Sequence, residues 1–190
     1  MGSLISAGTR DVSVHHNLYA HNDQRNPKMK GDKDTLGDID IYFDFVNNVV
    51  YNWGSYATAV TGNGQANIIN NYYKAGPNTT GYTSPREVLY WERRQTHLIY
   101  MDGNIGPNCP NGCDPDEDWN HMAGWWDGEH SCYESQGECL SSKSEVRINM
   151  PRITTTSAQA AYDQVLAEAG ATVGLNGDGT YFWRRDPVDE

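Results

Sequence analysis

The apolar and polar positions of the chain follow one recurring pattern. A short run of β-branched or aromatic residues leads into Asn, and apolar residues then resume. Such repetition is a signature of repeat architectures. Four segments share it, at 12–19, 45–51, 68–73 and 99–105. Their aligned asparagines are Asn17, Asn48, Asn71 and Asn104, with the shortest step between Asn48 and Asn71.

A solenoid of parallel β-coils explains the unequal spacing, because each coil has a near-fixed minimum length and extra residues leave it as loops. The pattern therefore predicts an all-β, right-handed parallel β-helix. The asparagines would stack at one corner and hydrogen-bond the backbone and neighbouring amides. The alternative is a sandwich with Asn-Asn hairpin turns. We favour the solenoid, because these pairs lie inside apolar runs and lack the Asn-Gly chemistry of tight hairpins.

The repeat ends after Gly106, and the sequence to about Lys143 is rich in Cys, Trp, Asp and Gly. This composition predicts a long loop pinned by disulfides. The lack of CxxC spacing favours two disulfides within the loop over a zinc site, and three pairings of the four cysteines stay open. Disulfides indicate an oxidising compartment. The four cysteines are Cys109, Cys113, Cys132 and Cys139.

A helical pattern occupies residues 157–169. Thr156 or Ser157 can cap its start, and Gly170 stops it. We expect this short C-terminal helix to pack on the flank or end of the solenoid. The length fits one domain, 1–190.

The charge balance narrows the choice of partners. A formal net charge of -11 and a pI near 4.8 argue against nucleic acid, which needs a basic stripe. Lys and Arg cluster once, between Arg25 and Lys33. An acidic protein that acts on a polyanion needs such a local cluster or bound divalent cations. No apolar stretch is long enough to span a membrane, and we expect any export signal to lie outside this sequence.

The basic cluster belongs to a longer motif. Residues 14–30 read Val-His-His-Asn-Leu-Tyr-Ala-His-Asn-Asp-Gln-Arg-Asn-Pro-Lys-Met-Lys. This segment resembles the active-site region of the pectate lyases of polysaccharide lyase family 1, where a His-His-Asn strand is followed by Arg-x-Pro-Arg-x-Arg. The resemblance continues at 45–54, 70–78 and 161–171, and so covers most of the chain outside the cysteine-rich stretch.

The resemblance implies a secreted, monomeric pectate lyase that cleaves the polysaccharide α-1,4-polygalacturonate by β-elimination and leaves 4,5-unsaturated products. Arg25 falls on the catalytic base, Lys28 on the middle basic position and Lys30 on the substrate-binding arginine. Lys30 keeps the charge but not the bidentate fork of arginine. We expect these three side chains to share one exposed face of the solenoid.

Calcium (Ca2+) is the implied cofactor. The family's calcium-binding carboxylates lie upstream of the His-His-Asn strand, so the resemblance implies that they precede this sequence. We therefore expect the 190-residue chain alone to cleave pectate poorly. Two alternatives stay open. A β-helix glycoside hydrolase would need paired carboxylates, and a non-catalytic solenoid would bind the polysaccharide without turnover.

Other polar residues favour structural roles. His15 and His16 are adjacent on an expected strand, so their side chains should point to opposite faces, one of them into the coil. Four aspartates between residues 32 and 40 show no spacing that dictates metal ligation. A further acidic cluster favours a solvated loop over a calcium site and comprises Asp114, Asp116, Glu117 and Asp118.

Overall fold

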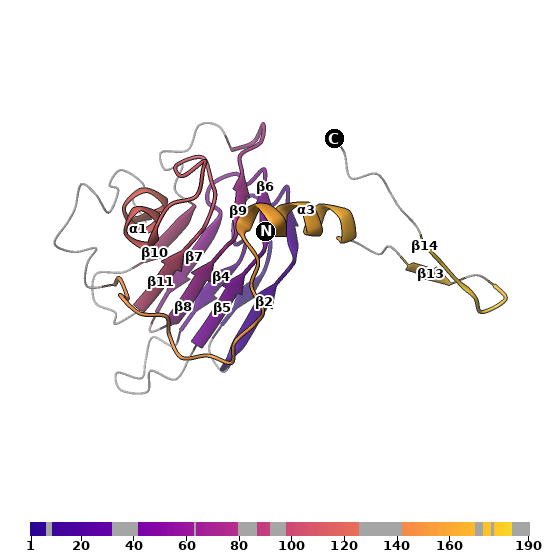
Figure 1. The fold of residues 1–190 in the computed structure, drawn as a ribbon, viewed down its shortest axis with the longest axis horizontal. Coiled ribbons are helices and arrows are strands. Elements are labelled where there is room, and N and C mark those ends of the chain that lie inside the picture. The colour runs from indigo at the N-terminus through magenta and orange to yellow at the C-terminus, as the bar shows by residue number, and fades with distance from the viewer. Residues whose placement is uncertain are drawn as a thin grey trace.

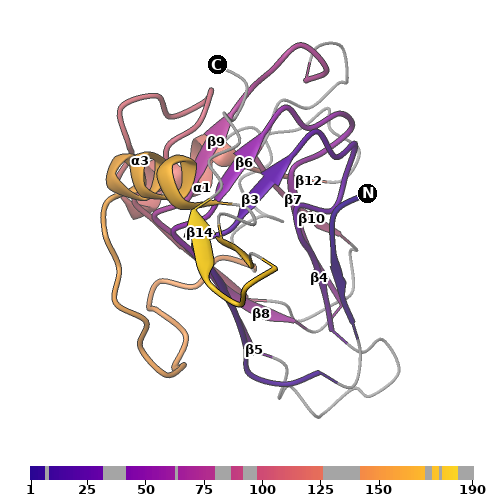
Figure 2. The same cartoon turned by 90° about the vertical axis from the view of Figure 1, so that its right-hand side faces the viewer.

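The computed structural model describes residues 1–6, 9–31, 42–62, 64–79, 87–91, 98–125, 142–169, 173–175 and 177–183. These residues form three sheets of parallel strands, which Figures 1 and 2 show around a common core. The first sheet contains β1 (Leu4–Ile5), β4 (Lys28–Lys30), β7 (Thr58–Thr61), β10 (Val88–Trp91) and β12 (Ala123–Trp125). The second contains β2 (Val12–His15), β5 (Tyr42–Val46), β8 (Gln65–Ile69) and β11 (Leu98–Asp102). The third contains β3 (Leu18–Ala20), β6 (Val49–Tyr51) and β9 (Tyr72–Lys74).

The chain visits the three sheets in turn, so each strand pairs in parallel with the strand one coil later. This topology confirms the parallel β-helix predicted from the repeat. Apolar side chains from all coils fill the interior, because alternate residues of a strand point to opposite faces. The fully buried members include Met29, Phe43, Phe45, Val60 and Ile68.

A ladder of asparagines joins the coils at the corner between the second and third sheets. The Oδ1 atom of Asn48 accepts from the backbone N of Asn17 at 3.0 Å and from its Nδ2 at 3.2 Å. Asn71 accepts in the same way from Asn48 at 2.9 and 3.1 Å, and Asn104 from Asn71 at 3.0 Å for both donors. The predicted stacking at one corner is therefore confirmed.

The residue before each ladder asparagine has a left-handed backbone. These residues are His16, Asn47, Asn70 and Gly103, with φ of 55°, 53°, 52° and 66°. Gly adopts this conformation freely, and Asn and His are enriched in it among the other residues. The repeated conformation turns the chain sharply, so the ladder side chain points inward and the preceding side chain points outward.

A long segment, residues 142–157, crosses the outer face of the second sheet (Figure 1). Ile148 exchanges two hydrogen bonds with the Asn67 side chain, at 2.9 and 3.0 Å, and Arg147 pairs with fully buried Asp44 at 3.5 Å. Asn67 also donates to Asp44 at 2.6 Å. This segment covers polar groups on the outside of the coils and leads into the C-terminal helix.

The helix α3 (Ala158–Glu168) confirms the predicted C-terminal helix. Ser157 caps it by accepting from the backbone N of Ala160 at 3.3 Å. It packs on the third sheet, where the Tyr162 ring lies 4.4 Å from that of Tyr72 and the Tyr162 hydroxyl accepts from Lys74 at 2.8 Å.

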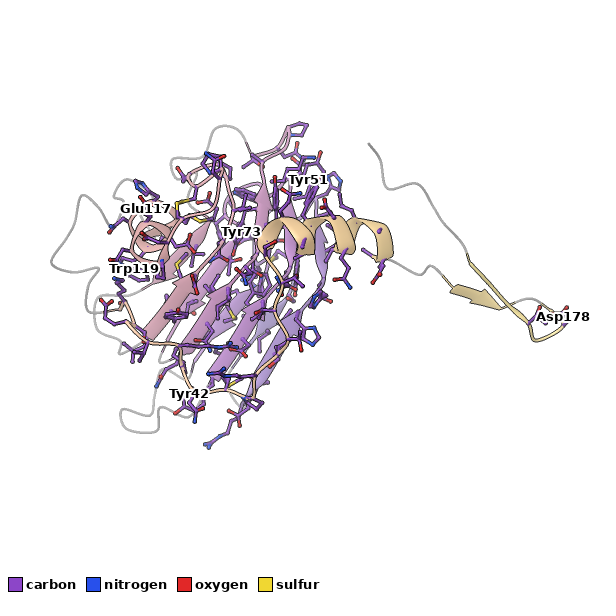
Figure 3. The ribbon with its side chains drawn as sticks, in the orientation of Figure 1. Tyr42, Tyr51, Tyr73, Glu117, Trp119 and Asp178 are labelled. Atoms are coloured by element: carbon purple, nitrogen blue, oxygen red, sulfur yellow. A yellow bond between two sulfur atoms is a disulfide. The ribbon has the colours of Figure 1, made fainter. Side chains whose placement is uncertain are left out.

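The hairpin of β13 (Val173–Leu175) and β14 (Tyr181–Trp183) is antiparallel and was not expected from the sequence. Figure 3 shows Asp178 at its tip, away from the solenoid. Asp178 accepts from the backbone N of Thr180 at 2.9 Å, which stabilises the turn.

The expectation of one long irregular loop after Gly106 is wrong for residues 115–125. The helix α1 (Pro115–Met122) and the strand β12 lie there. Asp114 caps α1 by accepting from the backbone N of Asp116 and Glu117 at 3.0 and 2.9 Å, and proline is favoured at the first helical position. This local signature outweighs the loop-like composition.

Asp118 on α1 ends the asparagine ladder, so its predicted role in a solvated acidic loop is wrong. Its Oδ2 atom accepts from the backbone N and Nδ2 of Asn104 at 3.0 and 2.8 Å, and the side chain is fully buried. Among the described residues, Oδ1 has no hydrogen-bond partner. Burial raises the pKa of Asp118 to about 7, although the hydrogen bonds from Asn104 act in the opposite direction.

The disulfide expectation holds in part. Cys109 and Cys113 form a disulfide beside α1, within the predicted range. Cys132 and Cys139 lie outside the described residues, so their predicted pairing stays a prediction.

We predict that Asn71→Ala lowers the free energy of unfolding by about 3 kcal/mol or more. It strips partners from Asn48 and Asn104 and from the Phe45 carbonyl, all inside the structure. Asn17→Ala, at the exposed end of the ladder, is the matched control and should cost about 1 kcal/mol. Equal losses of unfolding free energy for the two variants in urea-induced unfolding would contradict the view that the buried part of the ladder contributes most to stability.

A second prediction concerns pH. Because the folded pKa of Asp118 lies above its ordinary value of 3.8, its burial disfavours folding increasingly as pH rises from about 4 to 7. Asp118→Asn should therefore raise the free energy of unfolding by about 2–4 kcal/mol at pH 8 and change it little at pH 4. Glu117→Gln, at an exposed position of the same helix, is the control. A pH-independent difference between wild type and Asp118→Asn in urea unfolding would refute this.

Candidate active site

Arg25 lies at the corner that precedes β4, with φ of 66°. Its carbonyl accepts from the backbone N of Ser3 at 2.8 Å, and the backbone N of Asn26 donates to Ala57 O at 2.9 Å. The Thr58 hydroxyl also donates to the Asn26 carbonyl at 2.8 Å. The neighbouring strands thus hold the backbone of this corner from both sides.

Lys28 and Lys30 lie on β4, on either side of fully buried Met29. Because strand residues alternate in direction, an inward Met29 places both lysines on the outer face of the first sheet. In register, Lys28 pairs with Ala59 and Lys30 with Thr61 on β7. The structure therefore puts the three predicted site residues on β4 and the corner that leads into it.

A turn of the next coil packs against the Arg25 corner. The Asp23 carboxylate accepts from the backbone N and the hydroxyl of Ser55 at 3.1 and 3.2 Å, and its carbonyl accepts from Gly54 N at 3.0 Å. A Cβ at Gly54 would collide with the Asp23 carboxylate, so glycine is required for this close approach. The turn presents Tyr56 to Arg25.

Tyr56 is a site residue that the sequence analysis missed. It is 2% exposed, and burial raises the pKa of its hydroxyl, while a hydrogen bond from Arg25 acts in the opposite direction. The Arg25 Nε is buried and has no hydrogen-bond partner among the described residues. Tyr56 thus fixes one side of the guanidinium from the neighbouring coil. No spacing in the sequence links these residues.

Among the described residues, no cluster of three His, Cys, Asp or Glu ligand atoms lies beside Arg25. In the part of the chain that the structure describes, the only group of three His, Cys, Asp or Glu ligand atoms close together is Cys109, Cys113 and Asp118. The two sulfurs there form the disulfide, and calcium prefers oxygen ligands. The four aspartates between residues 32 and 40 lie outside the described residues.

The expectation that His15 and His16 point to opposite faces is wrong. Their Nδ1 atoms lie 3.0 Å apart, and their rings meet edge to face with centroids 5.3 Å apart. The left-handed backbone at His16 ends the alternation of the strand and turns both rings outward.

The fold and these residues define a parallel β-helix with cationic residues along one outer strand. No protein-family model matches the chain. It is 33% identical over 167 residues to a probable pectate lyase C of Neosartorya fischeri, which covers 85% of this chain and 33% of the relative. It is also 42% identical over 95 residues to a probable pectate lyase C of Aspergillus terreus, covering 47% of this chain and 20% of the relative.

A third relative, a probable pectate lyase C of Aspergillus fumigatus, is 45% identical over 73 residues, or 36% of this chain and 15% of the relative. These similarities confirm the resemblance to pectate lyases predicted from the sequence. The chain spans about a third or less of the length of these relatives.

We predict that Tyr56→Phe frees the Arg25 side chain while the fold persists. The substitution keeps the buried ring and removes one hydrogen bond, at a cost of about 1 kcal/mol. The Nε–Hε group of Arg25 should become more mobile in 15N relaxation measurements. Tyr100→Phe, which removes a hydroxyl bonded to Asp102 on the second sheet, should leave Arg25 unchanged. Unaltered Arg25 mobility in Tyr56→Phe would contradict the positioning role.

Proposed function

We propose that this chain forms the catalytic-base side of the cleft in a calcium-dependent pectate lyase. The observation that carries the proposal is the placement of Arg25, Lys28 and Lys30 on β4 and its corner, in a protein of net charge -11. A polyanion approaches an acidic protein only where local cations reverse the field. The names of the similar proteins support the same substrate class.

Each residue has a defined task in the proposed reaction. Lys28 and Lys30 bind carboxylates of α-1,4-polygalacturonate and orient one sugar so that its C5 faces Arg25. Arg25, acting in its neutral form, takes the C5 proton and becomes a guanidinium ion, and the electrons of the C5–H bond form the C4–C5 double bond. The C4–O bond breaks, its oxygen takes a proton from water, and the new chain end is 4,5-unsaturated. Tyr56 holds the guanidinium in place.

Calcium supplies charge neutralisation at the substrate carboxylate when it is bound, which makes the C5 proton more acidic. Its ligands would be residues other than those that the structure describes around Arg25. Arg25 and the two lysines position the substrate and accept the proton, and none of these tasks requires them to contact the metal.

We further propose an extracellular, monomeric protein that acts on pectate. The disulfide between Cys109 and Cys113 supports an oxidising location. Within the described residues, no helix combines the length and hydropathy needed to cross a membrane.

The test is the absorbance of unsaturated uronides, measured with polygalacturonate and calcium in any longer protein that contains this chain. Arg25→Lys should lower the rate by about 10³-fold or more, because lysine cannot place a nitrogen where the guanidinium reaches C5. Circular dichroism should show an unchanged fold. Arg152→Lys, an exposed cation on the segment that crosses the second sheet, should keep full activity.

The other outcomes separate the alternatives. Retained turnover in Arg25→Lys would refute Arg25 as the base. New reducing ends without ultraviolet absorbance would indicate a hydrolase. Binding of pectate without turnover in both the wild type and the variant would indicate a non-catalytic carbohydrate-binding solenoid.

A further inference from the structure

The outward pair of histidines next to α3 has the geometry of a chelating site. His15 ends β2, and His16 occupies the left-handed corner that follows it. His15 is exposed and His16 is partly exposed, so neither ring is committed to the core. The Asn17 side chain donates to the His15 carbonyl and to the Asn48 side chain. These hydrogen bonds hold the backbone of the two histidines in place.

The separation of the two Nδ1 atoms matches adjacent ligands of one metal ion. Zinc lies about 2.0–2.1 Å from imidazole nitrogen. Two such bonds to atoms 3.0 Å apart enclose an angle of about 95°. That angle lies between octahedral and tetrahedral values. Both nitrogens must be unprotonated, which leaves each ring proton on Nε2.

The surroundings of His16 favour the neutral imidazole, which is the form that binds a metal ion. Burial lowers the pKa of His16, and the neighbouring His15 lowers it further, while the Glu168 carboxylate acts in the opposite direction. Glu168 is the last residue of α3, and its carboxylate is near enough to His16 to raise the pKa of that ring. Two protonated imidazoles would repel at this distance, and a metal ion can take the place of the shared proton.

We propose that the Nδ1 atoms of His15 and His16 chelate a divalent transition-metal ion such as Zn2+ or Ni2+, with Glu168 as the nearby anion that offsets its charge. Imidazole nitrogen suits these ions, whereas calcium selects oxygen ligands. The site is therefore separate in chemistry from the calcium of the proposed function. It also involves none of the residues Arg25, Lys28 and Lys30.

The test is calorimetric titration of the untagged 190-residue chain with Zn2+ and Ni2+ after treatment with a chelator. One site is expected. His15→Ala and His16→Asn should each weaken metal binding at least about tenfold. Loss of a hydrogen-bond partner of a metal ligand already lowers affinity by about that factor, and loss of the ligand itself should lower it at least as much. Asn tolerates the left-handed backbone at residue 16, so this variant keeps the fold.

One control variant and one variant of the nearby anion make the result specific. His121→Ala, on α1, should bind both metals like the wild type, and Glu168→Gln should bind a few-fold more weakly. Excess calcium should not compete, so the result is independent of the pectate lyase proposal. Affinity that persists in the His15→Ala/His16→Asn double variant would overturn the inference. Absence of wild-type binding would show that the two rings share only a hydrogen bond and would overturn it equally.

Discussion

The asparagine ladder is the constraint on which the rest of the structure depends. Each buried amide accepts from both the backbone and the side chain of the previous asparagine, so the ladder fixes the axial register of successive coils. A slip of one residue would break these bonds and exchange the inner and outer faces of the strands. The ladder ends at Asp118, where a carboxylate takes the acceptor role of the next amide and ties α1 to the last coil.

The same register creates the candidate site. With Met29 held inside, Lys28 and Lys30 must face outward, and Arg25 stands at the corner that begins their strand. Contacts from the next coil then orient the corner, through Asp23 and the turn that carries Tyr56. The solenoid thus supplies a rigid row of cations on an acidic protein. A repeating polyanion matches a row of this kind, because its charges recur along a line as the cations do.

Most of the fold can be predicted from the sequence, because each coil of a solenoid repeats the same pattern of residues. The asparagines, the apolar runs beside them and the capped helix after Ser157 are local signals, and each lies where it was expected. What the sequence hid are contacts between coils, such as Tyr56 with Arg25, and the buried end of the ladder at Asp118. The helix α1 did carry a local signal, since Asp114 and Pro115 form an N-cap with proline at the first position. This helix was missed because the composition of the surrounding stretch is typical of a loop. The paired rings of His15 and His16 depend on one left-handed residue, which overrides strand alternation.

The register of the ladder turns Lys28 and Lys30 outward on one strand, and we propose that this strand binds pectate. The most direct measurement is a nuclear magnetic resonance titration of the 15N-labelled chain with trigalacturonate. We expect shift changes centred on the amides of Arg25, Lys28 and Lys30, with smaller changes on β7 and none on α1. Changes centred on the second or third sheet, or no changes at saturating ligand and low salt, would contradict it.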